Sequence, residues 1–161
     1  MKHRPFASRL GLFAAALGLS MAGPLCAQAG AGQVSLAVGT QAPAVTLEDL
    51  SGKAVNLQDL TRGKPALIEF WATWCEQCEA LQPQIDEIQQ RFGSQVSVVA
   101  VAVAVAQTQR RVQQHVTEHK LAYPFLWDAG GNAVRAFDAA TTAIVVILDK
   151  DGKVAYTGVG P

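Results

Sequence analysis

Two cysteines separated by two residues stand where an apolar run of the sequence gives way to a helix-like stretch. The apolar run covers residues 66–71, Cys75 and Cys78 come shortly after it, and helical spacing follows as far as residue 92. This junction places the cysteines at a helix N-terminus, where free backbone N–H groups stabilise a thiolate. Because the thiolate is the species that attacks disulfides, the spacing predicts a redox-active disulfide.

The same pair is also compatible with a structural disulfide or with one half of a zinc site. A zinc site needs four ligands, and the other two usually come from a second Cys-x-x-Cys or from two histidines. The sequence has no second cysteine pair, but His115 and His119 are four residues apart in a predicted helix. We therefore predict a redox dithiol with no metal site and keep metal binding as an alternative.

The first 29 residues have the features of a secretory signal peptide. Basic residues precede an apolar run over 10–22 that is too short to span a bilayer, and Ala27 and Ala29 occupy the positions that signal peptidase reads. We predict cleavage after Ala29. Cys26 raises the alternative of a lipid anchor, but Leu25 stands where lipid attachment needs a small residue, so we expect Cys26 to be lost with the signal.

The predicted mature chain consists of a flexible lead-in over residues 30–37 and one domain over 38–161. Cleavage would remove three basic residues and no acidic ones, which leaves a net charge of −3. The sequence has no basic patch that would predict a nucleic-acid partner, and it has no second apolar run that would predict a membrane span. An exported chain whose only cysteines form one close pair belongs where disulfide chemistry occurs, so we expect the periplasm.

Hydrophobic periodicity divides this domain into alternating strands and helices. The predicted order is a hairpin (41–47 and 54–57, with Gly52 at the bend), a helical turn (59–63), a buried strand (66–71), a helix kinked by Pro83 (75–92), a buried Val/Ala strand (96–106), a helix (108–120), a short helix (133–137) and a final hairpin (144–148 and 153–157). This order predicts an α/β fold with a mixed central sheet flanked by helices and an N-terminal β-hairpin.

Four stretches of the chain resemble the thioredoxin superfamily, and in particular its exported TlpA/ResA-like, AhpC/TSA-type thiol-disulfide oxidoreductases. They are residues 39–57, the active-site run 70–78, Pro83 five residues past the second cysteine, and the hairpin 147–154. The active-site run is highly specific and the flanking stretches are moderately so. The resemblance spans roughly residues 38–160 and implies a thioredoxin-like fold with thiol-disulfide exchange activity.

The resemblance also implies roles for single residues. Cys75 would be the exposed nucleophile and Cys78 the buried resolving thiol, while Trp74 would shape partner docking unless it only fills the core. Glu69 precedes Cys75 by six residues, where many thioredoxins carry a buried acid. Such a carboxyl would have a raised pKa and could exchange a proton with Cys78; the alternative is that Glu69 lies at an edge or pairs with a lysine.

Two features depart from the family. The family places a cis-proline opposite the cysteines, and here Ala143 takes that position after Thr142. A cis bond before a non-proline residue costs about 2.5–4 kcal/mol, so we predict a trans bond. We still expect the loop at Thr142 and Ala143 to contact the substrate, although its changed geometry makes metal capture easier.

The sequence also stops at Pro161, where the family usually adds a last helix. We therefore expect either that the sequence is truncated or that something else, such as a partner, covers one face of the sheet.

The predicted function is reduction of disulfides in exported proteins, with no cofactor beyond the Cys75–Cys78 disulfide. Glu76 between the cysteines opposes thiolate formation and so favours a reductant over an oxidant. The expected partners are a protein disulfide, for which an apocytochrome c is one candidate, and a membrane thiol-reductant carrier; oligomeric state is left open. The alternatives are a copper or zinc carrier, a redox-inactive binding module, and a peroxiredoxin-like peroxidase, which would need threonine in place of Ala72.

Overall fold

The computed structural model describes residues 33–160, so the predicted signal peptide and Cys26 lie outside the described part. The elements are β1 (Thr46–Asp49), β2 (Ala54–Asn56), α1 (Leu57–Thr61), β3 (Ala66–Trp71), α2 (Glu76–Phe92), β4 (Ser97–Val103), α3 (Gln109–His119), β5 (Phe125–Asp128), α4 (Asn132–Ala136), β6 (Ile144–Leu148) and β7 (Val154–Val159). Within residues 33–160, no helix combines the length and the apolar character needed to cross a membrane.

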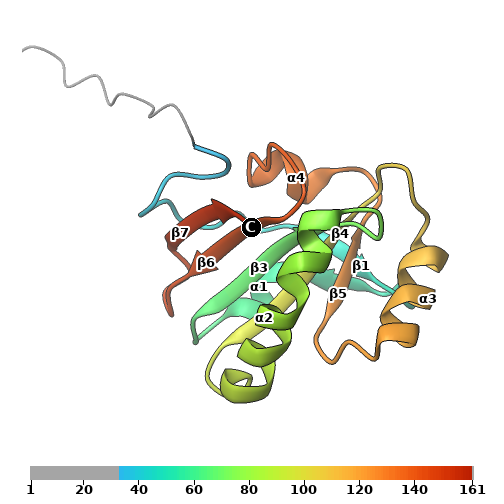
Figure 1. The fold of residues 1–161 in the computed structure, drawn as a ribbon. Coiled ribbons are helices and arrows are strands. Elements are labelled where there is room, and N and C mark those ends of the chain that lie inside the picture. The colour runs from blue at the N-terminus through green and yellow to red at the C-terminus, as the bar shows by residue number, and fades with distance from the viewer. Residues whose placement is uncertain (1–32, 161) are drawn as a thin grey trace, which may run out of the picture.

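The strands form one mixed sheet in the order β2-β1-β5-β4-β3-β6-β7. The three inner strands β5, β4 and β3 run parallel, and antiparallel hairpins add β1 and β2 at one edge and β6 and β7 at the other. In Figure 1, α2 lies across the front of the sheet, with α3 on one side and the β6–β7 hairpin on the other. This arrangement confirms the predicted α/β fold with a mixed sheet and an N-terminal hairpin.

The centre of the sheet is the core of the domain. Every residue of β3 and β4 is buried, as the apolar character of both segments predicts for strands covered on two faces. The two strands pair in parallel from Ala66 opposite Ser97 to Trp71 opposite Ala102. Because β3 ends at Trp71, the chain leaves the sheet immediately before the two cysteines.

Helices cover both faces of β3. The Trp71 ring lies 5.1 Å from the ring of His115 in α3, whereas the Phe70 ring lies 5.6 Å from that of Phe137, just after α4. Consecutive residues of a strand point to opposite faces, so α3 and the end of α4 lie on opposite sides of the sheet. The Glu69 side chain therefore lies on the same face of β3 as that of Trp71, the face covered by α3.

The first predicted strand, over residues 41–47, is wrong in its position. β1 begins only at Thr46, and Gln41 forms a single bridge with Lys153 near the β6–β7 turn. Pro43 has no N–H group to donate and so interrupts any ladder through this segment. The chain passes along the final hairpin before it enters the sheet.

The described end of the predicted lead-in contacts the domain. Ser35 is fully buried and its hydroxyl donates a hydrogen bond to the Phe137 carbonyl at 2.7 Å. The Ala140 N–H donates to the Val34 carbonyl at 3.2 Å. Residues 34 and 35 are thus attached to the segment that follows α4.

Candidate functional site

Cys75 and Cys78 form a disulfide at the N-terminus of α2, with their Cα atoms 5.2 Å apart. Cys75 is the N-cap residue of the helix, and its sulfur accepts a hydrogen bond from the Cys78 N–H at 3.1 Å. In the reduced protein the same N–H would face a Cys75 thiolate, which is the stabilisation expected at a helix start. The helix begins here because β3 ends and the Cys75 N–H closes a turn onto the Ala72 carbonyl at 3.1 Å.

The two sulfur-bearing residues differ in their surroundings. Cys78 is fully buried, and Cys75 is only 5% exposed, which is far less than the resemblance implies, but Cys75 lines a groove. A target disulfide can therefore approach Cys75 but not Cys78. This placement supports the predicted division into an attacking and a resolving cysteine.

Glu69 lies in the middle of β3 and is 1% exposed. Ala100 of β4 and Val145 of β6 flank it, and within the described residues neither carboxylate oxygen has a hydrogen-bond partner. Burial away from water raises the pKa of Glu69 to about 8. Glu69 is therefore neither at a sheet edge nor paired with a lysine, and it can hold or release a proton near neutral pH.

Trp74 lies on the surface beside the disulfide. Its side chain is 45% exposed, and the indole N–H donates to the Val105 carbonyl at 2.7 Å. The alternative that Trp74 only fills the core is excluded by this exposure. A large, exposed aromatic ring next to Cys75 is a suitable contact for a protein partner.

Ala143 is buried and adopts a left-handed conformation with φ of 58°. Every peptide bond in the described part of the chain is trans, as we predicted for the bond before Ala143. The Ala143 N–H donates to the Phe70 carbonyl and its own carbonyl accepts from the Gly160 N–H, both at 2.8 Å. Its backbone groups are thus bonded within the chain, and only Thr142 of the two predicted contact residues is partly exposed.

A segment that the sequence analysis did not single out fixes the loop before Cys75. The Gln107 side chain accepts from the Thr73 N–H at 2.9 Å and donates to the Val103 carbonyl. Arg111 of α3 donates to the Thr73 hydroxyl at 3.0 Å. The two bonds to Thr73 join residues more than thirty positions apart, and no local pattern in the sequence predicts them.

A groove of about 400 Å³ begins at Cys75 and runs between α2 and α3. Trp71 contributes to its inner surface, and the His115 and His119 rings stack on each other at 4.1 Å along the α3 side. The α2 side consists of Glu79, Gln82, Pro83 and Asp86. The predicted histidine pair therefore lies near Cys75, as part of the groove wall.

The alternative of a metal carrier receives no support from this geometry. Among residues 33–160 there is no group of three or more His, Cys, Asp and Glu side chains that could hold a metal ion. The His115 ring packs between Trp71 and His119.

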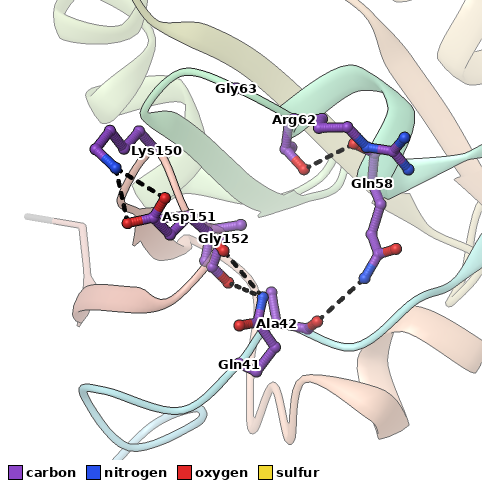
Figure 2. A pocket seen from close by; sticks show the side chains of 10 residues that line it. Gln41, Ala42, Gln58, Arg62, Gly63, Lys150, Asp151 and Gly152 are labelled. Carbon is purple, nitrogen blue, oxygen red and sulfur yellow. Dashed lines mark hydrogen bonds and ion pairs between the residues drawn. The ribbon is translucent and has the colours of Figure 1, made fainter.

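A second pocket, of about 170 Å³, lies at the opposite end of the sheet. Leu148, which lines it, pairs with Ala66 at the start of β3, while the cysteines follow the end of that strand. Figure 2 shows how its polar groups are already paired: Lys150 with Asp151, and the Gln41 amide with backbone carbonyls of the turn. This pocket offers no reactive group.

The helix-capping disulfide after a central strand, on a helix-flanked mixed sheet, defines a dithiol protein of the thioredoxin superfamily. A family model described as Redoxin matches residues 37–161, and the chain belongs to this family. It is similar to the thiol-disulfide oxidoreductase ResA of Bacillus thuringiensis, with 31% identity over 117 residues. The match covers 73% of this chain and spans 66% of the length of that relative.

Solved structures share the fold. The thioredoxin domain of a thiol-disulfide oxidoreductase from Bacteroides vulgatus superposes with a TM-score of 0.70 at 22% identity, over 79% of this chain and 91% of that one. A secreted disulfide oxidoreductase of Mycobacterium tuberculosis, homologous to Escherichia coli DsbE, gives a TM-score of 0.64 at 26% identity, over 73% and 84%. The predicted thioredoxin-like fold is confirmed.

Proposed function

We propose that this protein is a thiol-disulfide oxidoreductase that reduces disulfides of exported proteins. The observation that carries the proposal is the asymmetry of the Cys75–Cys78 pair. One sulfur borders an open groove at a helix start, and the other is enclosed behind it. The similarity to ResA, which is named a thiol-disulfide oxidoreductase, supports the oxidoreductase part of the proposal.

The reaction begins with the reduced dithiol. The Cys75 thiolate attacks one sulfur of the target disulfide, an S–S bond forms between protein and target, and the other target sulfur leaves as a thiolate. Cys78 then loses its proton and attacks the Cys75 sulfur, which releases the second target thiolate. Two electrons pass to the target, and the protein ends with the Cys75–Cys78 disulfide.

Glu69 is proposed to accept the Cys78 proton. Both groups are buried, so the proton has no direct contact with bulk water. With a pKa of about 8, Glu69 is mostly protonated at pH 7, and the ionised fraction, which grows as the pH rises toward 8, is the form that can accept the proton. No metal or organic cofactor enters this scheme.

Location and partners are further parts of the proposal. The predicted signal peptide and the secreted relative from Mycobacterium tuberculosis support export to the periplasm. A reductant in that compartment has to be recharged, and a membrane thiol carrier is the proposed source of electrons. An apocytochrome c is one candidate target, on the basis of the family resemblance.

Trapping the intermediate tests the function. Cys78→Ser removes the resolving thiol, so the reduced variant should accumulate a mixed disulfide between Cys75 and a peptide disulfide, visible as an added mass. Cys75→Ser, the matched control, should form none. An adduct on Cys78 in the control, or no adduct in either variant, would contradict the assigned roles.

The reduction potential of the mature protein tests the direction of electron flow. Equilibration with glutathione, read by alkylation of free thiols, should give a value near or below about −230 mV, on thioredoxin's side of the known range. A value near about −120 mV would make the protein a disulfide donor.

A further inference from the structure

The α2 side of the groove next to Cys75 is one continuous helical face. Glu79, Gln82, Pro83 and Asp86 follow one another at three, one and three residues, so all four point in one direction. Gln82 donates to the Asp86 carboxylate at 2.9 Å and to the Tyr123 hydroxyl at 2.8 Å, which fixes the middle of this face. Within the described residues, Glu79 has no side-chain hydrogen bond or ion pair and faces the groove without a partner.

The charge along the groove is negative. Glu79 and Asp86 are its acidic residues, and none of the lining residues is a lysine or an arginine. On the α3 side, burial first of all, and then the neighbouring His119, lowers the pKa of His115. His115 is thus neutral at pH 7 and does not offset the two carboxylates. One cation lies at the border of the groove, because Arg111 donates a hydrogen bond to the hydroxyl of Thr73, which lines the groove; two carboxylates thus stand against one guanidinium.

We propose that this groove binds the target polypeptide beside its reactive cysteine and selects targets with lysine or arginine there. The inference rests on the proposed function, because a polypeptide enters the groove only when its cysteine reaches Cys75. It adds a substrate class to that function: disulfides in basic sequence surroundings. The two carboxylates would repel an acidic segment at the same place.

The spacing of Glu79 and Asp86 along α2 predicts the positions of the basic residues in the target polypeptide. At 1.5 Å of rise per residue, Glu79 and Asp86 lie roughly 6 and 16 Å along α2 from Cys75. An extended segment advances about 3.3 Å per residue, so basic side chains roughly two and five residues from the target cysteine would meet the two carboxylates. Between them the segment would pass Gln82 and Pro83 on one side and the stacked histidines on the other.

Three disulfide peptides that differ only at those two positions test the proposal. They carry lysine, glutamine or glutamate, and the readout is the second-order rate constant for oxidation of the reduced protein at low salt. We expect the lysine peptide to react about tenfold faster than the glutamate peptide, since exposed ion pairs contribute severalfold each. In the double variant E79Q/D86N this ratio should fall to about two, the remainder being long-range attraction.

Glu87→Gln is the matched control. It changes the net charge by one unit on the same helix, but Glu87 is paired with Arg91 and is not part of the groove. The lysine-to-glutamate ratio should stay near the wild-type value in this variant. A ratio that falls equally in E87Q and in either single variant, E79Q or D86N, would show that overall charge rather than the groove selects the target.

The outcomes separate this proposal from the function on which it rests. Equal rates with the three peptides would overturn the groove proposal and leave the oxidoreductase function standing. A lysine preference that persists in E79Q/D86N would also overturn it. Failure to exchange with every peptide and with glutathione disulfide would overturn both.

Discussion

Glu69 is a carboxyl group held where a carboxylate is unfavourable. Its neighbours across the sheet are Ala100 and Val145, and within the described residues neither oxygen has a partner. Burying an ionised group without a partner is costly, so the side chain keeps its proton up to a pKa of about 8. An apolar residue would suit this position better for stability alone, which favours a chemical reason for the acid.

The sign of the pH effect follows from the raised pKa. Between pH 4.5, the ordinary value, and about 8, folded protein holds a proton on Glu69 that the unfolded chain has released. The contribution of Glu69 to the free energy of unfolding should therefore be greatest below pH 4.5 and fall through this window, by about 1.4 kcal/mol per pH unit. Glu69→Gln should flatten this slope in urea unfolding of the oxidised protein; parallel profiles for the two proteins would contradict the assignment.

At the scale of elements, the loop between β3 and α2 depends on the segment that follows β4. Gln107 bridges the Thr73 N–H and the Val103 carbonyl, and the Val105 carbonyl accepts from the Trp74 indole. Parallel strands β3 and β4 end at the same edge of the sheet, so their trailing loops meet there. The loop before Cys75 is thus positioned by a segment that is distant in sequence.

Replacing Gln107 by alanine should loosen this loop. The Thr73 N–H and the Val103 carbonyl would lose their partner, and we expect a loss of about 1–3 kcal/mol of unfolding free energy. Hydrogen exchange should show a faster Thr73 amide with little change in the interior of β3. Gln113→Ala, at an exposed position of α3, is the control and should change neither quantity.

At the scale of the whole molecule, the sheet rather than the disulfide holds the fold together. β3 and β4 are buried along their full length, and β6 completes the other side of β3. The cysteines are only three positions apart, so their bond closes a very short loop. The chain-entropy account gives such a loop about 2 kcal/mol of stabilisation.

Reduction should therefore leave the protein folded. Chemical unfolding with and without a thiol reductant should differ by about 2 kcal/mol in free energy, with similar far-ultraviolet circular dichroism before the transition. The double variant C75S/C78S should match the reduced protein. A domain that loses its structure on reduction would show that the pair is a structural staple.

Local patterns in the sequence predicted the elements whose own residues show a clear hydrophobic pattern. The apolar run 66–71 and the spacing over 75–92 correspond to β3 and α2 almost residue for residue, because periodicity and burial act within a few positions. The site itself could be placed only in part. The pairing of β5 between β1 and β4 and the contacts of Gln107 depend on residues far apart along the chain, and the groove exists only once two helices have packed.

The order of the strands in the sheet also determines when the domain can fold during synthesis. β3 needs β4 on one side and β6 on the other, and β6 begins only at Ile144. A ribosome that has finished β5 has released both cysteines, yet the strand that leads to them still has an open edge. The strand that closes that edge is β6, so the end of the domain that carries the cysteines can mature only after β6 has emerged.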